Sequence, residues 1–392
     1  MSFDDFETTL EDFGSSTPSQ PEPLLNDGAM FLPWHKPRKQ WIRENQWWKQ
    51  IERNLINNPT FGTDTIKYFG LPGKDLLDIR YFEQRLSSSN KKICLLGLIN
   101  SPQEWKSAQE QLSKIYDLIG IDKDSSIERL DFDNLLDYNT IGYSKIKKFE
   151  YFHIVNLDFC SSLIPNNTND NRLRALEHLI HYQLQKVPNN WLLFITTRTS
   201  KDTSNSNTYE ELVRCVDHNL IQDDFYNKFI EIFSDVILND RSIDRNSLEN
   251  QKFINIFIVG LFNWISKNSH ELNFDIKLSS LACYDIQGDN SNDMISMCFT
   301  FKKILSSPTI PANLLSLRET NLRALSKIQK IIPLDTIISS DIDRYTSIVQ
   351  QQIQLLNEAG YDTSQYIAEM CTSDLQSFSV DPEIFANSLQ LS

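Results

Sequence analysis

The stretch Tyr151-Phe-His-Ile-Val-Asn-Leu-Asp-Phe-Cys-Ser-Ser-Leu163 decides the fold of this 392-residue chain. Its first half is a nearly continuous apolar run, as expected of a strand that is covered on both faces within a parallel sheet. Asn156 and Asp158 follow at the point where such a strand would end. Because ligands of open α/β sheets bind outside the carboxyl ends of the strands, the stretch predicts a ligand site there.

Short apolar runs alternate with amphipathic stretches around this strand. The predicted parallel strands cover residues 65–69, 92–98, 127–132, 149–157 and 191–197. Two later runs, joined by turn-forming residues, predict an antiparallel hairpin of strands 274–286 and 294–305. The pattern predicts an α/β fold: a doubly wound, mostly parallel sheet with a C-terminal antiparallel hairpin, plus helical additions.

Composition divides the chain into four parts. Residues 1–28 contain seven Asp or Glu and no Lys or Arg, which is half of the net charge of −14, and predict a disordered acidic tail and linker. Residues 29–60 form a basic, Trp-rich helical segment. Residues 61–305 form the α/β domain with a helical insertion at 205–268, and residues 306–392 form a C-terminal helical extension.

The acidic tail also contains Phe3, Phe6, Leu10 and Phe13. One interpretation is a solvated segment without a binding role. The other is a peptide whose apolar side chains dock on a protein partner while its carboxylates steer the encounter. The tail is therefore the predicted contact with a protein partner.

The basic segment allows two interpretations as well. Residues 33–53 contain six Lys or Arg, two Glu and four of the seven Trp residues. Cations interleaved with aromatic rings can bind a phosphate backbone and stack on bases. Alternatively, helical spacing packs the Trp rings on the core and leaves the charges in solvent. The first interpretation assigns nucleic-acid or partner contact to Trp34, His35, Lys36, Arg38, Lys39, Trp41 and Arg43.

Several functional classes are disfavoured by composition. A net charge of −14 argues against a protein that coats nucleic acid. No apolar run reaches the roughly 18 residues of a membrane span, and the acidic N-terminus is unlike a secretory signal, so we expect a cytoplasmic protein without membrane contact. None of the six cysteines forms a CxxC pair, which predicts buried reduced thiols and no metal site.

The order of five parallel strands, a helical insertion and a hairpin resembles class I S-adenosylmethionine-dependent methyltransferases. Ile66-Lys-Tyr-Phe-Gly-Leu-Pro-Gly73 resembles the first-strand motif of DNA and RNA methyltransferases. Asn156-Leu-Asp-Phe159 lies where amino-methyltransferases carry an Asp- or Asn-Pro-Pro-Tyr or -Phe motif, and Asp131-Phe-Asp133 follows the third strand. The resemblance covers roughly residues 60–305.

The resemblance implies a role for each matching residue. Asn156 and Asp158 would face the reacting group as catalytic residues, with S-adenosylmethionine as the cofactor. The implied cofactor-binding residues are Gly70, Pro72, Gly73, Asn100 and Asp131. Asp131 would meet the adenine amino group, and the glycines would let the backbone approach the cofactor.

Two departures from the family weaken this assignment. The second strand ends in Asn100, where the family usually has a carboxylate that binds the ribose hydroxyls. Leu157 and Asp158 stand in place of Pro-Pro in the fourth-strand motif. The cofactor site is thus either retained in altered form or lost.

The chain also resembles a group of bacterial methyltransferase-fold proteins that occur with mobile elements and antiphage defence genes. That resemblance implies a non-catalytic or divergent subunit that acts as a binding or scaffold component of a defence complex. The alternative is an active S-adenosylmethionine-dependent methyltransferase that acts on nucleic acid or another macromolecule.

Overall fold

A computed structural model describes residues 31–166, 171–270, 272–286, 292–304, 317–373, 378 and 382–390. The predicted acidic tail, residues 1–28, lies outside the described residues. Among the helices in the described ranges, none combines the length and the apolarity that crossing a membrane requires.

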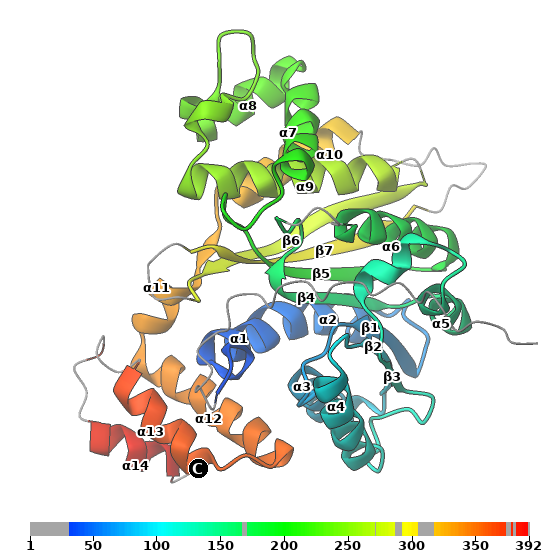
Figure 1. Ribbon diagram of the computed structural model, residues 1–392, viewed down its shortest axis with the longest axis vertical. Helices are drawn as coiled ribbons and strands as arrows, with labels where there is room; N and C mark the ends of the chain where they lie inside the picture. Colours follow the sequence, from blue (N-terminus) through cyan, green and yellow to red (C-terminus); the bar gives the residue numbers. More distant parts are fainter. Residues whose placement is uncertain are drawn as a thin grey trace, which may run out of the picture.

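The centre of the molecule is an eight-stranded sheet in the order β3-β2-β1-β4-β5-β7-β6-β8 (Figure 1). Strands β1 to β5 run parallel to one another, and β7 is antiparallel to both of its neighbours, β5 and β6. The strands are β1 Thr65–Gly70, β2 Lys92–Leu98, β3 Ser126–Glu128, β4 Ile154–Ser162, β5 Trp191–Arg198, β6 Phe274–Tyr284, β7 Met294–Lys303 and β8 Ile332–Pro333. The predicted mostly parallel α/β sheet with a C-terminal antiparallel pair is confirmed.

Helices cover both faces of the sheet and bury two separate apolar cores (Figure 1). The first core is enclosed by α5 Ile141–Phe149, α6 Arg172–Lys186, α7 Ser206–Leu220, α8 Asp223–Phe233, α9 Asn250–His270 and α10 Leu317–Ile328. The second is enclosed by the N-terminal segment, α3 Leu77–Leu86, α4 Pro102–Ile115, α11 Leu334–Ser339, α12 Ile342–Ala359, α13 Thr363–Ser373 and α14 Pro382–Gln390. This layering arises because strand side chains alternate between the two faces of the sheet. The apolar runs in β1, β2, β4 and β5 therefore contribute side chains to both cores.

The N-terminal segment consists of a short 3-10 helix, the extended residue Lys36, and then a continuous helical run that changes type along its length. It comprises η1 Pro33–His35, α1 Pro37–Trp41, η2 Ile42–Trp48, α2 Lys49–Ile51 and η3 Glu52–Ile56, of which η2 and η3 are π-helical. Ile42, Trp47, Ile51 and Leu55 are all buried, at intervals of five, four and four residues. Such intervals exceed the 3.6-residue turn of an α-helix, and the wider π turns bring these side chains onto one face.

Two predicted strands have other boundaries in the structure. The third was predicted at 127–132, but β3 is Ser126–Glu128, and Phe132 begins a 3-10 helix that ends at Leu136. The fourth was predicted at 149–157, but α5 extends to Phe149 and β4 begins at Ile154. Phe149 belongs to the buried face of the helix, and an apolar residue at such a junction fits either pattern.

The cysteines only partly match the expectation of buried thiols. None of the six, which all lie in the described ranges, forms a disulfide, and Cys94, Cys283 and Cys298 are buried. Cys160 is exposed. It lies on the same face of β4 as Asn156 and Asp158, and burial on this face decreases from Asn156 to Cys160.

Candidate functional site

The two predicted catalytic residues lie on the face of the sheet that the second core covers. Along β4, the apolar Val155, Leu157 and Phe159 belong to the first core. The intervening Asn156 and Asp158 therefore face the opposite side. Strand β1 ends at Gly70, opposite Asn156, while β4 continues to Ser162. Asn156 and Asp158 therefore lie beside the end of β1, and not at the end of their own strand as the sequence suggested.

Asp158 forms an ion pair with Lys39 of α1. The exposed fractions of the two side chains are 15% and 5%, so the pair is largely removed from water. Burial raises the pKa of the Asp158 carboxyl, and the Lys39 ammonium opposes that rise. Lys39 Nζ also lies 4.7 Å from the centroid of the Trp47 ring, which provides a cation–π contact.

Asn156 participates in a neighbouring buried hydrogen bond. Its Nδ2 donates to the Tyr68 hydroxyl at 2.9 Å. Its Oδ1 has no hydrogen-bond partner within the described part of the chain. Burial raises the pKa of the Tyr68 phenol well above its usual value, so Tyr68 stays neutral here.

The glycine turn after β1 is closed by this chain's own side chains. A Cβ on Gly70 would stand 2.7 Å from the Tyr68 ring and 3.0 Å from the Asn156 carbonyl oxygen. The indole of Trp34 lies 3.5 Å from the corresponding position at Gly73. Pro72 packs against Gly97 of β2, where a Cβ would lie 2.9 Å from the Pro72 ring. The small residues thus serve close packing in this structure, and the expected cofactor approach remains a prediction.

Residues 34 and 35 lie over the loop that follows this turn. His35 donates from Nε2 to Asp75 Oδ2 at 2.9 Å, while its Nδ1 accepts from the Leu32 amide at 3.1 Å. The Tyr361 hydroxyl donates to the other carboxylate oxygen of Asp75 at 2.9 Å. Burial lowers the pKa of His35, so the ring stays neutral. Burial alone would raise the pKa of Asp75, but the bonds from His35 and Tyr361 lower it overall.

The other cations that were predicted to contact nucleic acid also face carboxylates of the same chain. Lys36 pairs with Glu369, Arg38 with Asp335, and Arg43 with Asp78 at 2.6 Å. Arg43 is almost fully buried and also donates to Gln352 Oε1 at 3.1 Å. Trp41 is 7% exposed. Nucleic-acid contact by this segment remains a prediction, and it would require these side chains to leave their carboxylates.

Asn100 and Asp131 meet at the ends of β2 and β3. Asn100 Nδ2 donates to Asp131 Oδ2 at 3.0 Å, and the pair lies at the surface. Asp131 also caps the 3-10 helix at Phe132, because its other carboxylate oxygen accepts from the Asp133 amide at 2.9 Å. The two residues predicted to contact ribose and adenine are therefore neighbours in space.

Sequence reasoning missed Asp75, Asp78 and Gln352, which together hold three residues of the basic segment. Asp75 lies in the turn before α3, and Asp78 lies in the first turn of that helix. Gln352 is separated from Arg43 by 309 positions, and no local pattern could have paired them.

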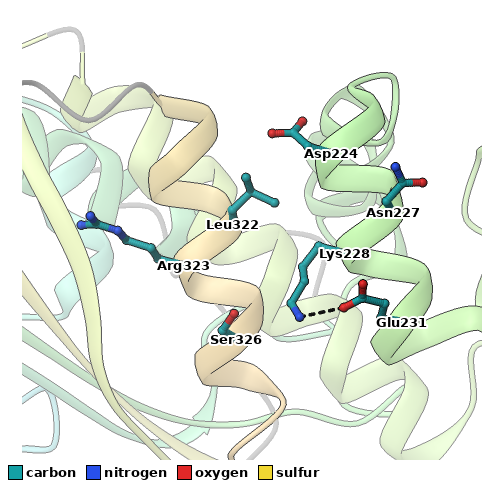
Figure 2. A pocket seen from close by; sticks show the side chains of 7 residues that line it. All are labelled: Asp224, Asn227, Lys228, Glu231, Leu322, Arg323 and Ser326. Carbon is teal, nitrogen blue, oxygen red and sulfur yellow. Dashed lines mark hydrogen bonds and ion pairs between the residues drawn. The ribbon is translucent and has the colours of Figure 1, made fainter.

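A groove of about 500 Å³ lies elsewhere, between α8 and α10 (Figure 2). Lys228 and Glu231 of α8 pair with each other on one wall, and Leu322 projects from α10 on the other. The lining contains none of the residues predicted to bind cofactor, substrate or nucleic acid.

Comparison with known proteins gives no match among curated proteins. Among solved structures, the chain is similar to the methyltransferase domain of a bacterial CtHen1, at 10% identity and a TM-score of 0.33, over 68% of this chain and 100% of that one. It is also similar to a class I S-adenosylmethionine-dependent methyltransferase of Listeria monocytogenes, at 10% identity and a TM-score of 0.36, over 77% of this chain and 73% of that one.

A third similar structure is a modification subunit of a type I restriction enzyme from Vibrio vulnificus, at 8% identity and a TM-score of 0.34, over 74% of this chain and 50% of that one. Values this low say nothing about activity, substrate or assembly. The sequence pattern of one family, PP_RS20740-like, matches residues 29–370, which include the cationic segment, the sheet and most of the C-terminal helices. The chain belongs to the PP_RS20740-like family.

Proposed function

We propose that this chain is a methyltransferase-fold subunit that acts by binding and not by methyl transfer in its resting state. The Lys39–Asp158 ion pair carries this proposal. Asp158 is the residue that the methyltransferase resemblance assigns to the reacting group. A carboxylate that is buried and neutralised by a lysine of the same chain has no room for a target amino group.

The helical run that follows Lys39 in the chain is held in place by buried apolar side chains. Trp47, Ile51 and Leu55 are each at most 1% exposed. Burying one such side chain stabilises a fold by about 1.5–3 kcal/mol, so the three together resist displacement strongly. Trp47 in addition stacks on Phe194 of β5, with ring centroids 6.2 Å apart. These contacts make the helix part of the second core.

The departures at the second and fourth strands support the same conclusion. Asn100 supplies no charge for a ribose, and its side chain is engaged with Asp131. The absence of Pro-Pro after Asn156 removes the backbone carbonyl geometry that the resemblance would need. A binding or scaffold component of a bacterial complex, with antiphage defence as its setting, is the role that the resemblance implies for such a chain.

Residues 1–28 are the proposed contact with a protein partner. The described body begins at Phe31, whose ring packs against Tyr361 and Tyr366, with centroids 5.9 and 5.0 Å away. Phe31, the first described residue, therefore packs against α13 and the loop between α12 and α13. The carboxylates of the acidic tail fit a partner with a basic surface, and its Phe and Leu side chains fit apolar pockets on that partner.

Calorimetric titration with S-adenosylmethionine and S-adenosylhomocysteine tests the proposal. The expected result is no saturable heat and no thermal shift at millimolar ligand. Saturable binding by the wild-type chain, together with transfer of a labelled methyl group to nucleic acid or protein, would overturn it. If binding occurs, Asp158→Asn should leave affinity nearly unchanged and abolish transfer, which would identify Asp158 as a catalytic residue.

A further inference from the structure

One side of the β6–β7 pair faces solvent along the first half of β6. The apolar side chains of this stretch belong to the first core: Phe274, Ile276, Leu278, Phe299 and Phe301. The side chains that alternate with them are exposed or partly exposed: Asp275, Lys277, Ser279, Thr300 and Lys302. They share the opposite side of the sheet, because side chains alternate along a strand and the Ser279 and Thr300 hydroxyls bond across the two strands at 2.6 Å. On that side the second core ends at Cys298 of β7.

Two lysines of the sheet lie close together on this open side. Lys302 is opposite Asp275 in the ladder, and Lys277 is opposite Thr300. The two lysines are therefore diagonal neighbours, which places their Cβ atoms roughly 7–8 Å apart.

Helix α10 adds two more cations beside them. Figure 2 shows that Arg323 points away from α8. Burial raises the pKa of the Asp275 carboxyl, and Arg323, Lys302 and Lys277 all oppose that rise, so three cations surround one carboxylate. Lys327 follows Arg323 by one helical turn and lies near Cys298 of β7. We call this cluster the basic face: Lys277, Lys302, Arg323 and Lys327.

The basic face lacks the paired carboxylates that other cations of the chain have. Lys36, Arg38 and Lys39 each form an ion pair, and so does Arg318 of α10 with Asp224. Within the described ranges, none of the four cations of the basic face forms one. Polar side chains are ordinary on the open side of an antiparallel pair, but like charges repel one another, so nothing in that arrangement favours a single sign. In a chain with a net charge of −14, the cluster indicates a counter-charge outside the described ranges.

Residues 4–12 of the same chain carry the complementary charge. They contain five carboxylates and no Lys or Arg, and they lie outside the described ranges. Eighteen residues separate Asp12 from Phe31, and an extended chain of that length reaches roughly 60 Å. Eight strands about 4.8 Å apart and at most eleven residues long give the sheet a diagonal of roughly 50 Å. The tail is therefore long enough to reach the basic face.

We infer that residues 4–12 dock on the basic face of their own chain. Each exposed ion pair is weak, so several must act together, and the contact is sensitive to salt. Covalent linkage keeps the tail at an effective concentration of roughly millimolar, which favours the chain's own face over that of a second copy. The inference goes beyond the proposed function, because it needs neither a cofactor nor a partner. A basic partner that binds the tail would first have to displace it from this face.

Carbodiimide cross-linking of the full-length chain, followed by mass spectrometry of its peptides, tests the inference. The reagent joins a carboxylate to a lysine amine where the two are in contact, and residues 4–12 offer the carboxylates. Cross-links to Lys277 and Lys302 should exceed those to Lys106 and Lys114, two exposed lysines of α4, by at least about fivefold. Raising the salt from about 0.1 M to about 1 M shortens the Debye length from about 10 Å to about 3 Å and should remove them.

A variant with one reversed charge keeps both reporter lysines. Arg323→Glu should lower the yield of the cross-links to Lys277 and Lys302 at least about threefold. Arg174→Glu is the matched control, because Arg174 is also exposed on a helix, α6, and it should leave the yield unchanged. A neutral acylating reagent checks that the two lysines remain equally reachable in both variants. Equal yields in Arg323→Glu and the control would overturn the inference.

A mixture of isotope-labelled and unlabelled chains identifies the source of the tail. Cross-links between labelled and unlabelled peptides would show docking on a second copy and overturn the inference. Cross-links spread evenly over the surface lysines, or none from residues 4–12, would also overturn it. A short DNA duplex that protects Lys277 and Lys302 from acylation in a chain without tail cross-links would assign the face to nucleic acid instead. None of these results bears on the calorimetric test of the proposed function.

Discussion

Lys39 and Asp158 form a buried pair in which each residue depends on the other. Replacing Lys39 by Met should lower the free energy of unfolding by about 3–5 kcal/mol, because the Asp158 carboxylate is then buried without a counter-charge. Urea denaturation at pH 7.5 measures the change. The loss should shrink as the pH falls, since the raised pKa of Asp158 lets the carboxyl take up a proton more readily.

The control for this prediction changes both partners. Lys39→Met with Asp158→Leu replaces the ion pair by apolar side chains and should recover most of the lost stability. A loss below about 1 kcal/mol for Lys39→Met alone would show that water reaches Asp158 freely.

His153 makes the fold sensitive to acid. Its side chain is 3% exposed, and Nδ1 accepts a hydrogen bond from the Lys67 amide at 2.9 Å. Burial, with Lys67 and Lys91 nearby, lowers the pKa of His153 to about 4. Protonation would place a hydrogen on the nitrogen that now accepts the Lys67 N–H.

Stability should therefore fall as the pH decreases from 6.5 to 4. Between these pH values His153 is protonated in the unfolded chain and neutral in the folded chain. A falling pH therefore favours the unfolded state. The full effect is roughly 3 kcal/mol for a shift of this size. His153→Gln should flatten the pH dependence of urea unfolding relative to the wild type. An unchanged slope would assign the acid sensitivity to other groups, such as His35, whose pKa is also lowered.

Individual contacts were the least predictable level of the structure. The sequence located Asn156 and Asp158 near one end of a strand but could not show which face they take, because that depends on where β4 begins. The partners of Lys39 and Arg38 are 119 and 297 positions away, and nothing in the local sequence relates them. Basic residues interleaved with Trp fitted a nucleic-acid-binding surface as well as they fitted the internal contacts that the structure shows.

Among the elements, two parts of the N-terminal segment should respond differently to loss of a Trp. Trp47→Ala removes a fully buried ring from η2 and should cost about 3–5 kcal/mol in unfolding free energy. Trp34→Ala in η1, where the ring is only partly buried, should cost clearly less. Thermal or urea unfolding of the two variants side by side checks this. Equal losses would mean that the fold depends on the partly buried ring of Trp34 as much as on the fully buried ring of Trp47.

Helices α7 and α9 cross so closely that the contact depends on a glycine. A Cβ on Gly260 of α9 would stand 2.6 Å from the backbone oxygen of Leu212 in α7. Gly260→Ala should destabilise the fold by about 1–3 kcal/mol, although alanine favours a helix intrinsically. Gly62→Ala is the matched control, because a Cβ there meets nothing within 4 Å. A neutral Gly260→Ala would show that the two helices can separate without loss.

Long apolar elements were predictable and irregular ones were not. Strand β2 was predicted from an unbroken apolar run, and the hairpin strands β6 and β7 were predicted from apolar-rich runs joined by turn-forming residues. The junction of α5 and β4 was misplaced because Phe149 suits either element. The π-helical turns were missed because their four- and five-residue spacing overlaps with the three- and four-residue spacing of an α-helix.

At the scale of the whole molecule, the acidic tail should be dispensable for folding. Residues 1–28 carry half of the net charge, and the described contacts begin at Phe31. Deleting residues 1–28 should shift the melting temperature by no more than about 2 °C. Deleting residues 1–41 should lower it further, because that variant also lacks the Lys39 partner of Asp158. A drop of several degrees for the shorter deletion would make the tail part of the core.

The contacts that close the strand ends join opposite ends of the chain. The Tyr366 hydroxyl donates to the His35 carbonyl oxygen across 331 positions, and Arg38 meets Asp335 across 297. A ribosome adds roughly 5–20 residues each second, so Phe31 to Trp41 wait many seconds for these partners to emerge. Throughout that interval Arg38 and the His35 carbonyl oxygen of the nascent chain lack these partners. Messages truncated before residue 335 would yield polypeptides in which these two contacts never form.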